Sequence, residues 1–220
     1  MLKVNENGDH DRWTLARILD HDPDFILEYI DFVFEQKERP SRYDDSHDYS
    51  FVWGRDDYEE LMAHITERIY GQEQERTIFA NSYLETFFEE RDDLSLEVKR
   101  KQDRFISSLI KQRHNDPEFM QFVFNVVAGL SPERRRRLLE LFLESNQRLE
   151  DFQRLPLQPS SYRWTGSAVP VLHERLEYLE SILPLLGTVY FLRHKQCVER
   201  EIQCIRSRIE HEEKKDFMRD

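Results

Sequence analysis

The sequence predicts an all-α protein, and three observations support this fold class. Only six glycines and eight prolines accompany 35% charged residues, a composition that suits long helices better than a turn-rich β fold. Apolar residues recur at three- and four-residue steps along most of the chain. An aspartate or serine followed by proline, a helix-start pair, occurs at Asp22, Asp116 and Ser131. We expect stacked antiparallel helix pairs, an irregular bundle or a HEAT-like array of about eight or nine helices.

Start and stop signals divide the chain into helical segments. They predict a short helix ending near Asp20 and a last long helix after Gly187. Between them, helices are expected to begin near residues 22, 56, 73, 95, 116, 131 and 167. Residues 38–55 are polar, acidic and aromatic by turns and lack this periodicity, so we predict a long loop there. Its residues Phe51, Val52 and Trp53 are expected to hold it against the core.

The chain length permits one large domain or two small ones, since it has 220 residues. The sharpest boundary follows Gly129, where a helix stop is followed by Ser131-Pro132-Glu133, a cap and a first turn. We therefore divide the chain into an N-terminal helical part, residues 1–130, and a C-terminal helical part, residues 131–220. The two parts are expected to form one continuous domain.

The most regular helix start lies within residues 155–186. A loop rich in proline and serine ends at Gly166, Ser167 can cap the next helix, and Pro170 falls in its first turn. One helix face then carries a leucine seam, Leu172, Leu176, Leu179, Leu183 and Leu186. The last helix carries a second seam, Phe191, Val198, Ile202, Ile205 and Ile209. We expect the leucine seam to be core and the second seam to be core or an oligomer contact.

Charge and apolar content exclude several classes of protein. The net charge of −12 disfavours non-specific nucleic-acid binding, because phosphate is repelled overall. No apolar run is long enough to span a membrane, and the first residues lack the apolar core of a secretory signal. Cys197 and Cys204 lie seven positions apart on one predicted helix, about 10 Å between Cα atoms and too far for a disulfide. We predict a cytoplasmic protein without a membrane partner.

Catalytic motifs are scarce. The sequence has no Walker-type phosphate loop, no GxSxG, no HExxH and no CxxC, and we predict no cofactor. Histidine–aspartate pairs at His10, His21 and His47 are better explained as helix caps and turns. His173 and Glu177, one helical turn apart, could ligate a metal with a third ligand such as His194. A solvated pair is the more common outcome, so we predict no metal site.

Two alternatives to a protein that binds another protein remain open. Arg206 and His211 have the Arg-x4-His spacing of HEPN-type ribonucleases, and an enzyme, either such a nuclease or a metal-dependent hydrolase, would use them or scattered residues. A local basic patch could instead bind nucleic acid, although ion pairing with neighbouring acids is the more common role of such residues. Its candidate residues are Lys99, Arg100, Lys101, Arg134, Arg135, Arg136 and Arg137.

The loop before the leucine seam is the predicted partner-binding surface. Tyr162, Arg163 and Trp164 combine aromatic anchors with a cation, and Ser167 follows a flexible glycine. The alternative is that Trp164 fills the space between the flanking helices.

Several phrases also resemble a known class of protein. They are Asp56-Asp57-Tyr58, Ser131-Pro132-Glu133-Arg134-Arg135, the stretch 164–170 and Leu183-Pro184-Leu185-Leu186. The chain looks like the helical C-terminal region of large bacterial antiphage or STAND-type NTPases. That resemblance implies a helical sensor or scaffold whose nucleotide-binding parts lie elsewhere. Our expectation is a non-enzymatic interaction module, bacterial and cytoplasmic, that binds a protein partner or self-associates.

Overall fold

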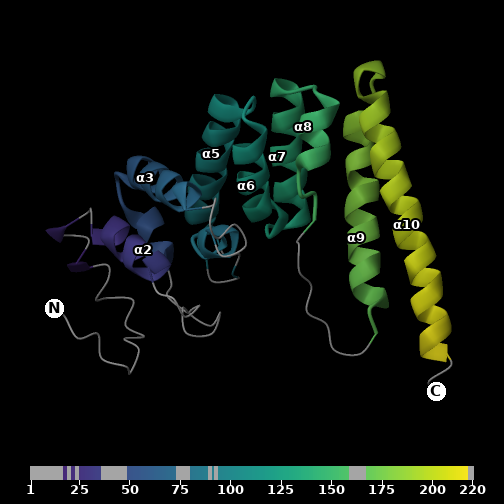
Figure 1. The fold of residues 1–220 in the computed structure, drawn as a ribbon, viewed down its shortest axis with the longest axis horizontal. Helices are drawn as coiled ribbons and strands as arrows, with labels where there is room; N and C mark the ends of the chain where they lie inside the picture. Colours follow the sequence, from purple (N-terminus) through teal and green to yellow (C-terminus); the bar gives the residue numbers. More distant parts are fainter. Residues whose placement is uncertain are drawn as a thin grey trace. The chain divides into compact units, whose positions relative to one another are not determined.

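The computed structural model describes residues 17–18, 21–22, 25–35, 49–72, 80–88, 91, 94–158 and 167–217. Every regular element within these ranges is helical and none is a strand, so the all-α prediction is confirmed (Figure 1). No helix in this part of the chain combines the length and apolar character that crossing a membrane requires.

The described α-helices are α2 (Phe25–Glu35), α3 (Tyr58–Gly71), α5 (Leu96–Arg113), α6 (Pro117–Ala128), α7 (Pro132–Ser145), α8 (Leu149–Arg154), α9 (Val169–Ile182) and α10 (Leu192–Phe217). Three 3-10 helices accompany them, η1 (Tyr49–Gly54), η2 (Leu183–Leu186) and η3 (Val189–Phe191). Residues 80–85 are also helical.

The chain divides into two compact units, Met1–Phe105 and Ile106–Asp220, with the boundary inside α5. The predicted division after residue 130 lies between α6 and α7, within the second unit. It stays a prediction.

Part of the predicted loop is a helix. Residues 49–54 of the expected 38–55 loop form η1, whereas residues 38–48 lie outside the described part. Val52 and Trp53 are fully buried and Phe51 is half-buried, as expected. The 3-10 turn was missed because its six residues are too few to show a helical period.

Trp53 is the centre of the first unit. Its side chain is 0% exposed, and its indole Nε1 donates a 2.7 Å hydrogen bond to the carbonyl of Phe87. Its ring meets those of Phe88 and Phe105 edge-on, with centroids 5.1 and 6.0 Å away. Burial of so large a side chain, with its one polar atom satisfied, ties η1 to residues 80–88 and to α5.

Lys101 of α5 binds backbone carbonyls at the end of η1. Its ammonium donates to the carbonyls of Trp53, at 2.8 Å, and Arg55, at 3.4 Å, and lies 4.7 Å from the centroid of the Tyr58 ring. A cation placed on the last carbonyls of a helix satisfies groups that the helix itself leaves without partners.

In the second unit, α6 begins as predicted. The Asp116 side chain accepts a 3.1 Å hydrogen bond from the amide of Phe119, and Pro117 occupies the first turn. Arg113 pairs with the same carboxylate at 2.6 Å. These contacts are local in sequence, which explains why the start could be predicted.

A buried polar network around Asn146, which is 3% exposed, joins the residue after the end of α5 to the end of α7 and to α8. Its Nδ2 donates to the carbonyl of His114 at 2.6 Å and to Oδ2 of Asp151 at 2.9 Å. Its Oδ1 accepts from the amide of Arg148 at 2.9 Å. The side chain thus satisfies a carbonyl just after α5 and an amide at the start of α8.

We expect Asn146→Ala to destabilise the protein by about 2 kcal/mol, because the substitution leaves buried partners unsatisfied. Urea unfolding followed by circular dichroism measures this change. Asn125→Ala is the matched control, since that amide donates to the carbonyl of Gln121 on its own helix and does not join separate elements of the described chain. Equal unfolding midpoints for the two variants would show that the network contributes little.

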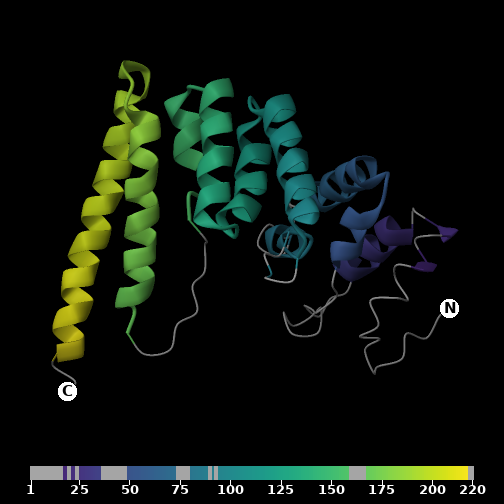
Figure 2. The same cartoon turned by 180° about the vertical axis from the view of Figure 1, so that it is seen from behind.

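Helices α9 and α10 form an antiparallel hairpin, and both views show them side by side (Figures 1 and 2). Four residues of the predicted second seam are buried, Val198, Ile202, Ile205 and Ile209. Leu172, Leu179 and Leu186 are buried on the facing side, whereas Leu176 and Leu183 are half-buried. The second seam therefore packs in the core of the hairpin, one of the two roles expected for it. An oligomer contact through this helix stays a prediction.

Helix α9 ends earlier than its leucine spacing suggests. It stops at Ile182, and η2 carries the chain on to Leu186. Pro184 explains the change, because it cannot donate the hydrogen bond that an α-helix needs. At the other end, the N-cap of α9 is Ala168, which makes no side-chain cap hydrogen bond, so the prediction that Ser167 caps this helix is wrong by one residue. The hydroxyl of Ser167 instead accepts from the amide of Val169, the first residue of α9, at 3.2 Å.

Candidate interaction surface on the α9–α10 hairpin

The end of the hairpin between α9 and α10 carries three exposed apolar side chains, Val189, Tyr190 and Leu192, which we call the tip. They are 89%, 80% and 55% exposed. In a 3-10 turn, residues three apart lie on the same side, so Val189 and Leu192 face the same way with Tyr190 beside them.

The local sequence explains how the tip is held. η2 ends at Leu186, and the amide of the next residue, Gly187, donates to the carbonyl of Pro184 at 3.3 Å. Thr188 is extended, and its carbonyl accepts a 3.1 Å hydrogen bond from the amide of Phe191, which closes the 3-10 turn. The Phe191 ring meets the buried His194 ring edge-on at 5.1 Å. One aromatic side chain thus anchors the turn while its neighbours face solvent.

An isolated exposed leucine is common, but three large apolar side chains in four consecutive positions are not. The other large exposed apolar residues of the described part, Phe32 and Leu96, lie singly on α2 and α5. Burying the tip would remove roughly 300 Å² of apolar surface from water, worth on the order of 7 kcal/mol. Association itself costs a comparable amount, so the tip needs further contacts to bind firmly.

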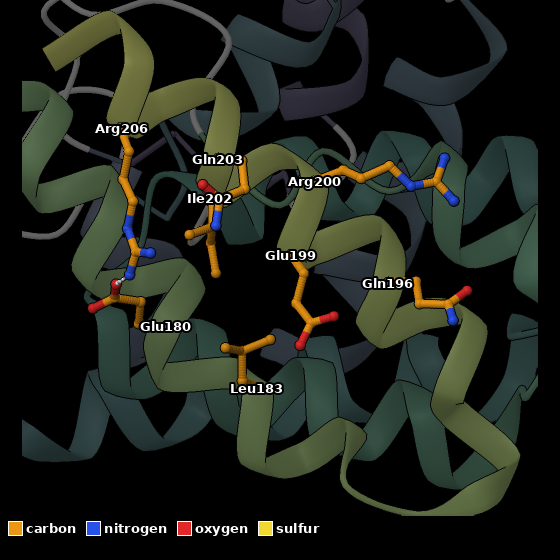
Figure 3. A pocket seen from close by; sticks show the side chains of 8 residues that line it. All are labelled: Glu180, Leu183, Gln196, Glu199, Arg200, Ile202, Gln203 and Arg206. Atoms are coloured by element: carbon orange, nitrogen blue, oxygen red, sulfur yellow. Dashed lines mark hydrogen bonds and ion pairs between the residues drawn. The ribbon is translucent and has the colours of Figure 1, made fainter. Parts of the chain in front are cut away.

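A groove along the same hairpin can supply such contacts (Figure 3), since its lining residue Gln196 lies one helical turn beyond Leu192 on α10. It measures about 730 Å³ and lies between the end of α9 with η2 and α10. Leu183 and Ile202 supply its apolar part, and Glu180 pairs with Arg206 at 2.7 Å across it. The remaining lining residues are Gln196, Glu199, Arg200 and Gln203.

The groove is electrically balanced, unlike the chain as a whole. Two carboxylates, Glu180 and Glu199, and two guanidiniums, Arg200 and Arg206, are among its lining residues, whereas the net charge of the chain is −12. Figure 3 shows Glu199 and Leu183 pointing toward each other from the two helices. An apolar strip between side chains of both signs suits a protein segment better than a nucleic acid, which would require a cationic lining.

The structure describes only one of the four residues predicted for partner binding. Tyr162, Arg163 and Trp164 lie outside the described residues, and the hydroxyl of Ser167 accepts a hydrogen bond from the amide of Val169 at the start of α9. The prediction that this loop is a contact surface is therefore untested.

The alternative nuclease pair does not meet at a common centre. Arg206 is bonded to Glu180 of α9, and five residues of α-helix separate the directions of Arg206 and His211 by about 140°. Both residues are exposed, and the hypothesis stays a prediction.

The candidate nucleic-acid residues have mixed environments. Lys101 is bonded to η1 carbonyls, Arg134 is 6% exposed, and the Arg135 guanidinium lies 4.1 Å from the centroid of the Tyr178 ring. These three are engaged within their own units, because each packs on or bonds to a neighbouring element. The exposed candidates are Arg100, Arg136 and Arg137, with Lys99 half-buried.

The histidine considered as a third metal ligand is buried. His194 is 2% exposed, whereas His173 and Glu177 lie on the exposed face of α9. Among the described residues, no group of three or more histidine, cysteine or acidic side chains is arranged to hold a metal ion.

Sequence reasoning missed the tip. It assigned Phe191 to the apolar seam of α10 and gave no role to Val189, Tyr190 or Leu192. The available signal was the apolar run 189–192 that follows Gly187 and Thr188, because large apolar residues in a turn are unusual.

Comparison with family models, curated proteins and solved structures finds no match to the chain. The resemblance to antiphage and STAND-type NTPases therefore stays a prediction.

Proposed function

We propose that this chain is a non-enzymatic helical interaction module that binds a protein partner through the tip of the α9–α10 hairpin. The observation that carries the proposal is the exposure of Val189, Tyr190 and Leu192 on a turn whose backbone is well held. A tyrosine among aliphatic residues is the composition typical of an interface anchor.

The surface areas favour a partner with a preformed apolar pocket over tip-to-tip dimerisation. A stable interface buries about 800 Å² on each side, whereas the tip offers only a few hundred. The groove along the hairpin would supply the remaining contacts through Leu183 and its polar walls. Assignment of the partner to a bacterial defence system follows from the resemblance alone and belongs to the same proposal.

Photo-crosslinking in the cells that produce the chain tests this function. p-Benzoylphenylalanine replaces Tyr190 in one variant and the exposed Glu210 of α10 in a control variant. We expect a discrete protein adduct from position 190, absent from position 210, that mass spectrometry identifies.

The pattern of adducts separates the alternatives. An adduct at twice the mass of the chain would show that the partner is a second copy of this chain and not a different protein. Equal labelling of many proteins from both positions, or none from position 190, would contradict the proposal. The identified partner, once purified, must also bind the unmodified chain directly.

A further inference from the structure

His194 lies beneath the tip in an aromatic pocket. Its ring centroid is 4.9 Å from that of Phe152 in α8 and 5.1 Å from that of Phe191 in η3. The side chain is 2% exposed, and neither ring nitrogen makes a hydrogen bond of good geometry to another described residue. A neutral imidazole fits this setting, whereas an imidazolium would be a buried charge that only the nearby backbone of Arg148 and the charge of Glu150 favour.

The charged groups around His194 have opposing effects. Its neighbours on α10, Arg193 and Lys195, are cations, and the third position of a helix lies at the positive end of the helix dipole. On α8, Glu150 favours the charged ring.

The other α8 carboxylate near this junction, Asp151, is engaged by Asn146 and by Arg148 at 3.6 Å. On η3 the only ionisable side chain is Tyr190. Burial is the largest influence and lowers the pKa of His194, with the backbone of Arg148 and the charge of Glu150 acting against it.

We propose that His194 is an acid-sensitive contact whose protonation separates Phe152 of α8 and Phe191 of η3 from α10 and so loosens the tip. The step from a loosened tip to weaker partner binding rests on the proposed function. The conformational change on protonation of His194 does not depend on it. Protonation of His194 would act on η3, because Phe191 is the aromatic side chain through which η3 packs against this ring.

The direction of the pH effect follows from the pKa. An unfolded histidine takes up a proton near its ordinary pKa of 6.5, whereas the buried ring resists protonation until the pH is lower. The contribution of the packed His194 ring to the free energy of unfolding is therefore fully present above about pH 6.5 and is lost as the pH falls below that value.

Hydrogen exchange with mass spectrometry tests the contact without any partner. Exchange of the full chain is compared at about pH 7.5 and about pH 5.5, after correction for the intrinsic rates. We expect peptides from α8 and from residues 188–195 to lose protection at the lower pH.

The matched control is His173→Gln, which removes an exposed histidine and should leave that loss unchanged. His194→Phe and His194→Gln both remove the titrating group and should abolish the loss, the first keeping an aromatic ring and the second a polar side chain. Unchanged protection of the wild-type chain at low pH, or an equal loss in either His194 variant, would overturn the inference.

The two proposals can fail separately. Crosslinking from position 190 is measured at neutral pH, where His194 is neutral, and so tests binding alone. Exchange at low pH tests the His194 contact alone.

Discussion

We expect Tyr190→Ser combined with Leu192→Ser to weaken binding to the crosslinked partner by a factor of about 100 while leaving the fold intact. A buried tyrosine anchor at an interface is worth about 2 kcal/mol or more, and the leucine adds to it. Both side chains are exposed in the free chain, so their loss should change the free energy of unfolding by less than about 0.5 kcal/mol. Isothermal titration calorimetry and thermal unfolding measure the two quantities.

A matched control comes from the first unit. Leu96 is 74% exposed but isolated, so Leu96→Ser removes a comparable apolar side chain without touching the tip. Its affinity should equal that of the wild-type chain. If Leu96→Ser and the tip variant weakened binding equally, general surface hydrophobicity would explain the interaction and the tip would have no special role.

We expect Trp53→Ala to unfold much of the first unit, with a cost of about 3–5 kcal/mol. The substitution removes the largest fully buried side chain of the described residues and leaves the carbonyl of Phe87 without its 2.7 Å donor. It also empties the space against Phe88 and Phe105. Since domains of this kind are stable by about 5–15 kcal/mol, the loss is a large share of the total.

Urea unfolding followed by circular dichroism measures this loss. Trp53→Phe is the matched variant, because it keeps an aromatic ring and should cost less than Trp53→Ala. Phe32→Ala, at a side chain that is 52% exposed, should cost least. Trp53→Ala with the unfolding midpoint of the wild-type chain would show that η1 is not needed to hold the first unit together.

Features that depend on nearby residues could be predicted from the sequence. The start of α6 depends on Asp116 and Pro117, and the seam of α10 depends on a regular apolar period. The burial of Trp53 was also predicted, because a large aromatic side chain in an otherwise polar stretch is most stable against the core. These inferences need only the chain within about ten residues of the position.

Features that depend on packing between residues far apart in the sequence could not be predicted from the sequence. The burial of His194 requires Phe152 of α8, which the sequence does not place beside it, and the residue was considered as a metal ligand instead. Val189, Tyr190 and Leu192 are exposed because no described element covers them. Their apolar composition alone does not reveal this. The early end of α9 was predictable in principle from Pro184, but the continuing leucine spacing obscured it.

Hydroxyl-radical footprinting of the chain with and without its crosslinked partner tests the central claim most directly. The method reports how readily each side chain is oxidised by solvent radicals. We expect Tyr190 and Leu192 to become protected when the partner is added, while the buried Tyr178 stays unreactive and Leu96 stays reactive. Protection elsewhere, with the oxidation of Tyr190 unchanged, would contradict a module that binds through the hairpin tip.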